Sequence, residues 1–135
     1  PEAQVLLPLV ESSLLDMMIY SIEENIKDYN IELGSNYAVT VVLAAKGYPN
    51  SYNKGMKIEG LDNIKDKIIF HAGTKLKNNE FFTNGGRVLN VVGMDRNLKK
   101  SISKAYHLVH LIDFEDKYYR SDIGMKAFKY LKENK

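Results

Sequence analysis

Tyr37-Ala38-Val39-Thr40-Val41-Val42-Leu43-Ala44 is a largely apolar, β-branched run that follows the turn-forming residues Gly34-Ser35-Asn36. β-Branched residues favour strands. An apolar run that does not alternate with polar residues is typical of a strand covered on both faces. The run therefore predicts a central strand over residues 37–44.

Shorter strand-like segments follow this strand, separated by turns rich in Gly, Asn and Asp. Brief strands joined by such turns are typical of antiparallel pairing. Residues 47–55 contain many turn formers and two tyrosines, which predicts an ordered surface loop. We expect an antiparallel meander built from residues 56–58, 67–70, 74–76, 81–83 and 87–93.

Three helices are predicted around these strands. Ser13 and Asp16 form a variant capping box, so the first helix is expected to begin there and to run to about Lys27. Asp95 or Asn97 is expected to cap a second helix that packs on the sheet, and a short helix is expected near the C-terminus. Apolar residues spaced by three and four support each one: Leu15, Met18, Ile22 and Ile26; Leu98, Ile102, Ala105, Val109 and Ile112; and Ile123, Ala127, Phe128 and Leu131.

The composition favours a single folded domain that binds neither nucleic acid nor membrane. The chain has 135 residues, 44% hydrophobic and 27% charged, which is close to the globular average. Its net charge of +2 is small, and it has no long basic run of the kind that binds nucleic acid. The apolar stretches are too short to span a bilayer. Without cysteine there is no disulfide and no thiolate chemistry, which suits a reducing cytoplasm.

The strongest candidate site lies between residues 70 and 89. Two glycine turns in this stretch would bring His71, Thr74 and Arg87 to one edge of the sheet. Backbone N–H groups at glycine turns and a guanidinium are the groups that bind phosphate. An alternative interpretation remains open at this point: Asn84-Gly85-Gly86 is a plain hairpin turn, and Arg87 is a solvated strand end.

Other candidates are weaker. His107 and His110 are three residues apart on the second predicted helix, but no third metal ligand is near in sequence. Glu2 and Gln4 would point to the same side of an extended strand. Arg120 and Asp122 would form a local ion pair. The chain contains no glycine-rich nucleotide loop and no nucleophile elbow.

Five segments are distributed over nearly the whole chain: residues 1–9, 42–49, 70–74, 83–89 and 119–124. In this order they resemble the C-terminal portion of the phosphoribosylamine-glycine ligase family. The resemblance implies an α+β fold with a small antiparallel, barrel-like sheet and flanking helices. It also implies that residues 1–34 close the ATP-grasp region and that residues 35–135 form the C-terminal domain.

The resemblance implies an activity for the longer enzyme. The family joins glycine to 5-phosphoribosylamine in purine biosynthesis, through a glycyl phosphate formed from ATP, and releases ADP and phosphate. Its ATP and its Mg²⁺ or Mn²⁺ are held by regions upstream of Pro1, so this chain alone is expected to be inactive and to contain no catalytic or metal-binding residue. A cytoplasmic location is also implied.

For this chain, the resemblance implies a role in holding the phosphoribosyl substrate. The residues expected to bind it are Arg87, Gly86, Gly85, His71, Thr74 and Glu2. Arg87 is the residue expected to meet the phosphate, and Glu2 belongs to an Asp-Pro-Glu motif that the chain enters at Pro1. Two alternatives are a stand-alone phosphate-binding module without catalytic activity and another ATP-grasp enzyme of purine synthesis.

Overall fold

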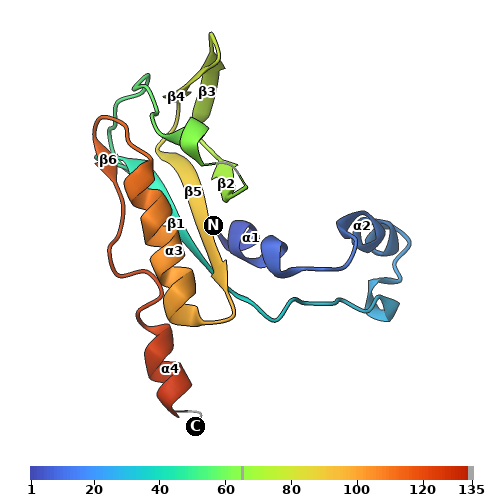
Figure 1. Ribbon diagram of the computed structural model, residues 1–135. Coiled ribbons are helices and arrows are strands. Elements are labelled where there is room, and N and C mark those ends of the chain that lie inside the picture. Colours follow the sequence, from blue (N-terminus) through green and yellow to red (C-terminus); the bar gives the residue numbers. More distant parts are fainter. Residues whose placement is uncertain (65, 134–135) are drawn as a thin grey trace.

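The computed structural model describes residues 1–64 and 66–133 (Figure 1). Helices and strands follow one another in a mixed order, and short 3-10 turns (η) join several of them. The elements are α1 (Glu2–Leu6), η1 (Leu7–Leu9), α2 (Leu14–Ile22), η2 (Ile26–Asp28), β1 (Tyr37–Ala45), η3 (Leu61–Asn63), β2 (Ile68–His71), β3 (Thr74–Lys77), β4 (Glu80–Thr83), β5 (Arg87–Asp95), α3 (Leu98–Leu111), β6 (Lys117–Tyr118) and α4 (Ala127–Glu133).

Four strands form an antiparallel sheet in the order β2-β5-β1-β6, and β3 and β4 form a separate two-stranded ribbon. The central strand predicted at residues 37–44 is confirmed as β1, which pairs with β5 along its length. The predicted α+β class with an antiparallel sheet is also confirmed. The described strands leave the sheet open, so it resembles a barrel only loosely.

The predicted simple meander is wrong in two respects. β2 pairs with β5 and not with its neighbour β3, because the chain turns away at Ala72 and Gly73, whose N–H groups both donate to the carbonyl of Val88. Residues 56–58 form no strand and contribute only an isolated bridge between Lys57 and Phe82. Strand β6 was not predicted because its two residues are too few to show a pattern.

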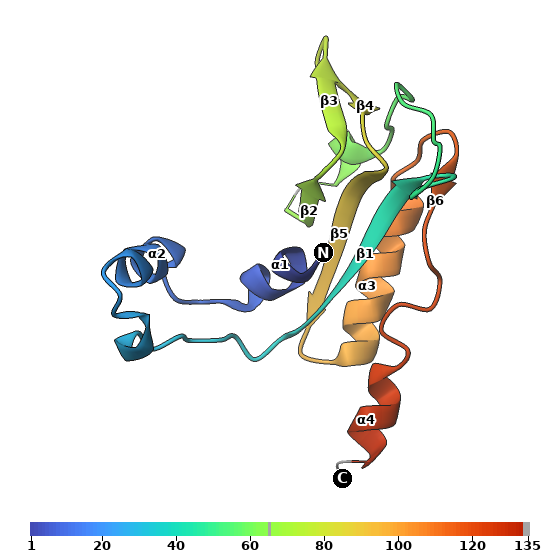
Figure 2. The ribbon, with the colours of Figure 1, turned by 180° about the vertical axis from the view of Figure 1, so that it is seen from behind.

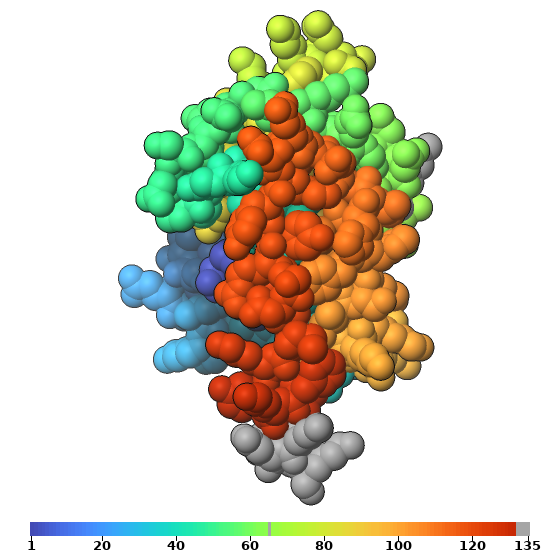
Figure 3. Space-filling view, turned by 90° about the vertical axis from the view of Figure 1, so that its left-hand side faces the viewer, coloured from blue at the N-terminus to red at the C-terminus, as the bar shows by residue number. Residues whose placement is uncertain are grey.

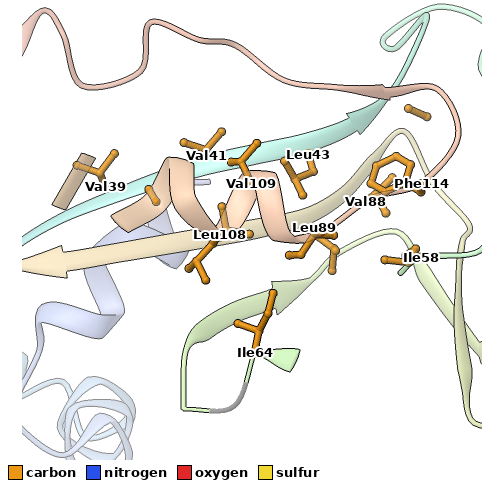
Figure 4. Packing of buried hydrophobic residues seen from close by; sticks show 14 residues of the cluster. Val39, Val41, Leu43, Ile58, Ile64, Val88, Leu89, Leu108, Val109 and Phe114 are labelled. Atoms are coloured by element: carbon orange, nitrogen blue, oxygen red, sulfur yellow. The ribbon is translucent and has the colours of Figure 1, made fainter. Parts of the chain in front are cut away.

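The core lies between the sheet and α3. Alternate residues of β1 and β5 point toward the helix, as expected for strands, and meet its apolar side (Figure 4). The segment that follows α3 then runs back beside the helix (Figure 3), where the Tyr106 hydroxyl donates to the carbonyl of Arg120 and accepts from the N–H of Ile123. The fully buried core side chains include Val41, Leu43, Val88, Leu89, Val91, Val109 and Ile112.

The other face of the sheet is only partly covered. Short helix α1 lies against it, on the side opposite α3 (Figures 1 and 2). Thr40 and Val42 on this face remain half-buried, so the prediction that both faces of β1 are covered is only partly right. The extended strand expected at Glu2 and Gln4 is also wrong, because the stretch from Glu2 to Leu6 is helical. Glu, Ala, Gln and Leu are good helix formers.

Helix α2 begins where predicted but ends early. Its N-cap is Ser13, whose hydroxyl accepts the N–H of Asp16 at 3.2 Å. The predicted extension to Lys27 is wrong because Glu24 adopts a left-handed backbone conformation (φ 60°), which ends the helix after Ile22. The predicted apolar stripe lies outside the core, since Leu15, Met18 and Ile22 are each more than half exposed.

The second and third predicted helices are present as α3 and α4. Asn97 is the N-cap of α3, and its side-chain oxygen accepts the N–H of Lys100 at 3.2 Å. Asp95 helps to hold the cap, because one of its carboxylate oxygens accepts the N–H of Asn97. Among the described residues, no helix combines the length and the apolar character that crossing a membrane requires.

Candidate functional site

A polar cavity of about 570 Å³ lies on the sheet face opposite α3, at the point where β5 begins. Three separate parts of the chain form its walls: α1, the loop after β1, and the two glycine turns that flank the β3–β4 ribbon. Its lining residues are Pro1, Glu2, Gln4, Tyr48, Ala72, Gly73, Gly86, Arg87 and Asn90.

Close contact between the glycine turns sets the position of β5. A Cβ atom on Gly73 would lie 2.6 Å from the Cα of Gly85, so only glycine allows the two backbones to approach this closely. The N–H of Asn84 donates to the carbonyl of Gly73 at 2.7 Å and locks the two turns together. The two turns therefore hold Gly86 and Arg87 at the cavity wall.

Tyr48 lies directly on Gly86. A Cβ atom at Gly86 would approach the Tyr48 ring to 2.1 Å, so the absence of a side chain there allows the ring to lie against the backbone. The ring of Tyr52 lies 6.1 Å from that of Tyr48 in an edge-on arrangement. The loop over residues 47–55, predicted to be ordered, thus supplies one wall of the cavity.

Charged groups of opposite sign line the cavity. Arg87 is exposed at the start of β5, and Glu2 lies across from it on α1. A hydrogen bond from its own backbone N–H lowers the pKa of Glu2, and the positive charge of Arg87 adds a smaller effect in the same direction. The carboxylate therefore stays ionised beside the guanidinium and can accept a hydrogen bond from an amine or a hydroxyl.

The structure separates the six sequence-predicted residues into two groups. Glu2, Gly86 and Arg87 line the cavity. Gly85, His71 and Thr74 are not part of its lining, although Gly85 supports it through its contact with Gly73. Binding of a ligand by any of the six stays a prediction.

His71 and Thr74 form a pair of their own next to the cavity. The His71 Nδ1 atom and the Thr74 Oγ1 atom share a hydrogen bond of 2.9 Å. The His71 ring also lies 4.5 Å from the Phe81 ring, and partial desolvation lowers the pKa of the imidazole. These contacts tie β2 to the β3–β4 ribbon, which gives the two residues a structural role.

Asn90 lines the cavity but was not predicted from the sequence. It lies in the middle of β5, where Val42 and Phe70 are its partners on the two neighbouring strands. Asn90 is only 3% exposed to solvent. The sequence signal that could have identified Asn90 is that it is the single amide within the apolar run from Val88 to Val92.

A second, apolar cavity of about 290 Å³ adjoins the first and shares Pro1, Tyr48 and Arg87 with it. Its wall includes Arg120, which forms the predicted ion pair with Asp122 at 2.7 Å. The hydrogen bond from Arg120 lowers the pKa of Asp122.

The two histidines of α3 do not share a site. His107 lines a separate cavity of about 520 Å³ between α3 and the edge of the sheet, whereas the ring of His110 contacts Tyr119 edge-on. Among residues 1–64 and 66–133, no group of three or more His, Cys, Asp or Glu side chains could hold a metal ion.

Comparisons with known proteins agree with this fold. A model of the phosphoribosylglycinamide synthetase C domain matches residues 38–126. The phosphoribosylamine–glycine ligase of Fusobacterium nucleatum is 45% identical over 128 residues, which cover 92% of this chain and 30% of that protein. The bifunctional purine biosynthetic protein purD of Dictyostelium discoideum is 44% identical over 139 residues, which cover 100% of this chain and 17% of that protein.

A solved structure is similar over the same region. The phosphoribosylamine–glycine ligase of Thermotoga maritima superposes with a TM-score of 0.72 and 34% identity, over 90% of this chain and 30% of that one. The fold is thus that of the C domain found in phosphoribosylamine–glycine ligases. The chain belongs to the phosphoribosylglycinamide synthetase C-domain family. The resemblance inferred from the sequence is confirmed, and the chain spans less than a third of the length of these relatives.

Proposed function

We propose that this chain acts as the C domain of a phosphoribosylamine–glycine ligase and holds the phosphoribosyl substrate in the polar cavity at the start of β5. The observation that carries the proposal is that Arg87 and Glu2 line the same cavity. A guanidinium matches two oxygens of a phosphate, and a carboxylate accepts hydrogen bonds from an amine. Phosphoribosylamine carries both of these groups.

The remaining chemistry of the ligase belongs to other parts of the enzyme. Glu2 is the only carboxylate in the cavity wall among the described residues, and Arg87 beside it opposes a cation. The cavity therefore does not fit Mg²⁺ or Mn²⁺. We assign ATP, glycine and the metal ion to the regions that this chain does not contain, and the whole enzyme to the cytoplasm.

Kinetics of a ligase with this sequence as its C domain test the role of Arg87. Arg87→Ala should raise the KM for phosphoribosylamine about 30-fold, because a charge-assisted pair with phosphate contributes on the order of 2 kcal/mol. The KM for ATP should change less than twofold. Arg120→Ala, which removes an arginine paired with Asp122 in the neighbouring cavity, is the matched control.

Two results would contradict the proposal. Equal changes in the KM for phosphoribosylamine and for ATP would mean that Arg87 acts on the fold or on closure of the enzyme. No change in either would mean that the phosphate binds elsewhere.

The chain on its own should give no ATP-dependent product.

A further inference from the structure

Asn90 points into the cavity from the middle of a buried strand. Its neighbours Leu89 and Val91 belong to the core under α3, so the alternation of a strand directs the Asn90 side chain to the opposite face. That face carries the polar cavity, and Asn90 is one of its lining residues. A polar amide thus occupies a position that the rest of the strand fills with apolar side chains.

The Asn90 amide has no hydrogen-bond partner within residues 1–64 and 66–133. In the same region, Thr40 Oγ1 is the one buried side-chain polar atom that is both sealed from solvent and unpaired. The Asn90 amide differs from the Thr40 hydroxyl because the amide opens into the cavity. Buried polar groups in proteins nearly always have a partner, whether protein or water. An amide without a protein partner that faces a cavity is therefore free to bond what enters the cavity.

The spacing along β5 separates two functions. Arg87 lies opposite Ala44 and Asn90 lies opposite Val42, two positions apart on one face of β1. Two strand positions span about 7 Å, so the backbone positions that carry the guanidinium and the amide are about the length of one small ligand apart. A ligand that contacts both must carry an anion at one end and a neutral hydrogen-bonding group at the other.

We propose that Asn90 is a specificity residue whose amide hydrogen-bonds a sugar hydroxyl of a pentose phosphate while Arg87 holds its phosphate, and this inference rests on the proposed function of the cavity. An amide suits a hydroxyl because it offers both donors and an acceptor, and a hydroxyl can satisfy either. Arg87 then supplies general affinity for phosphate. Asn90 selects phosphates that carry a sugar.

Titration of the 135-residue chain with ribose 5-phosphate and, separately, with inorganic phosphate tests this division. Asn90→Leu keeps the approximate size of the side chain and removes the amide. The variant should bind ribose 5-phosphate about tenfold more weakly, the equivalent of one lost hydrogen bond, and should bind inorganic phosphate as wild type does. Its melting temperature should not fall, because the amide has no partner in the protein to lose.

The wild-type chain offers a readout that does not depend on folding of the variant. In a nitrogen-15 spectrum, the side-chain NH₂ resonances of Asn90 should shift with ribose 5-phosphate and stay in place with inorganic phosphate.

Asn84→Ala removes an exposed amide from the neighbouring turn and is the matched control for the titration, with wild-type affinity for both ligands.

The outcomes separate the inference from the proposed function. Binding of both ligands with no selective effect of Asn90→Leu, or no ligand-specific shift of its resonances, would overturn the role of Asn90 and leave the role of Arg87 intact. Failure of wild type to bind either ligand would overturn the proposed phosphate site and the inference with it.

Discussion

At the scale of single residues, His71 makes stability depend on pH. Partial desolvation lowers the pKa of the folded imidazole below its ordinary value of 6.5. Above that pH the ring is neutral in both the folded and the unfolded chain, so its contribution is constant. As the pH falls below about 6.5, the unfolded chain binds a proton first, and the free energy of unfolding decreases until the pH has passed the folded pKa.

His71→Gln should therefore flatten the decrease in stability between pH 7.5 and pH 5.5. The variant has no imidazole to titrate, and its amide can still hydrogen-bond Thr74. Urea unfolding of both proteins at several pH values measures the difference in slope. His110→Gln, on the outer side of α3, controls for the loss of an imidazole elsewhere, and equal flattening in both variants would contradict the assignment to His71.

The sequence reveals charged site residues more readily than neutral ones. Arg87 was predicted because a guanidinium after a double-glycine turn is a recognisable pattern for phosphate binding. Asn90 was missed because one amide in an apolar strand has no meaning until the register shows which face it occupies. Glu2 was placed on a strand, but it lies on helix α1, which brings it to the cavity.

At the scale of elements, the packing of α3 on β5 depends on Gly93. A Cβ atom at this position would lie 2.1 Å from the carbonyl oxygen of Ser101 and 2.4 Å from the backbone nitrogen of Ala105. Both atoms belong to the backbone of α3, which cannot move aside as a flexible side chain can. The helix would have to lift from the strand that carries Arg87 and Asn90.

Gly93→Ala should destabilise the chain by about 3 kcal/mol, since overpacking against backbone forces the two elements apart. Chemical unfolding monitored by circular dichroism gives the value. Gly34→Ala is the matched control, because its nearest neighbour is the mobile carboxylate of Glu11, and it should change stability by less than about 0.5 kcal/mol. Similar effects of the two substitutions would mean that the contact at Gly93 does not set the position of α3.

Elements defined by local patterns were predicted best. The β-branched run gave β1, and the caps at Ser13 and Asn97 gave the starts of α2 and α3. The pairing of β2 with β5 was missed because it depends on contacts between residues distant in sequence. The apolar stripe of α2 was predicted correctly as a pattern, but periodicity alone does not identify what the stripe packs against.

At the scale of the whole molecule, the fold and the site draw on different parts of the chain. Every residue of the buried hydrophobic core among the described positions lies between Val39 and Phe114. The first 34 residues contribute no buried side chain, but α1 supplies Glu2 and Gln4 to the cavity. We therefore propose a boundary near residue 34, with the folded unit after it and a segment before it that completes the binding site.

A chain of residues 35–135 should accordingly still unfold in one cooperative transition. It keeps the contacts of the sheet with α3, and loss of α1 from the other face should cost only about 1–2 kcal/mol. Affinity for ribose 5-phosphate should fall, because the wall that faces Arg87 is gone. Thermal unfolding and titration of the shortened chain measure the two effects separately. A chain that lost its cooperative transition would show that the first segment belongs to the fold, and unchanged affinity would show that α1 takes no part in binding.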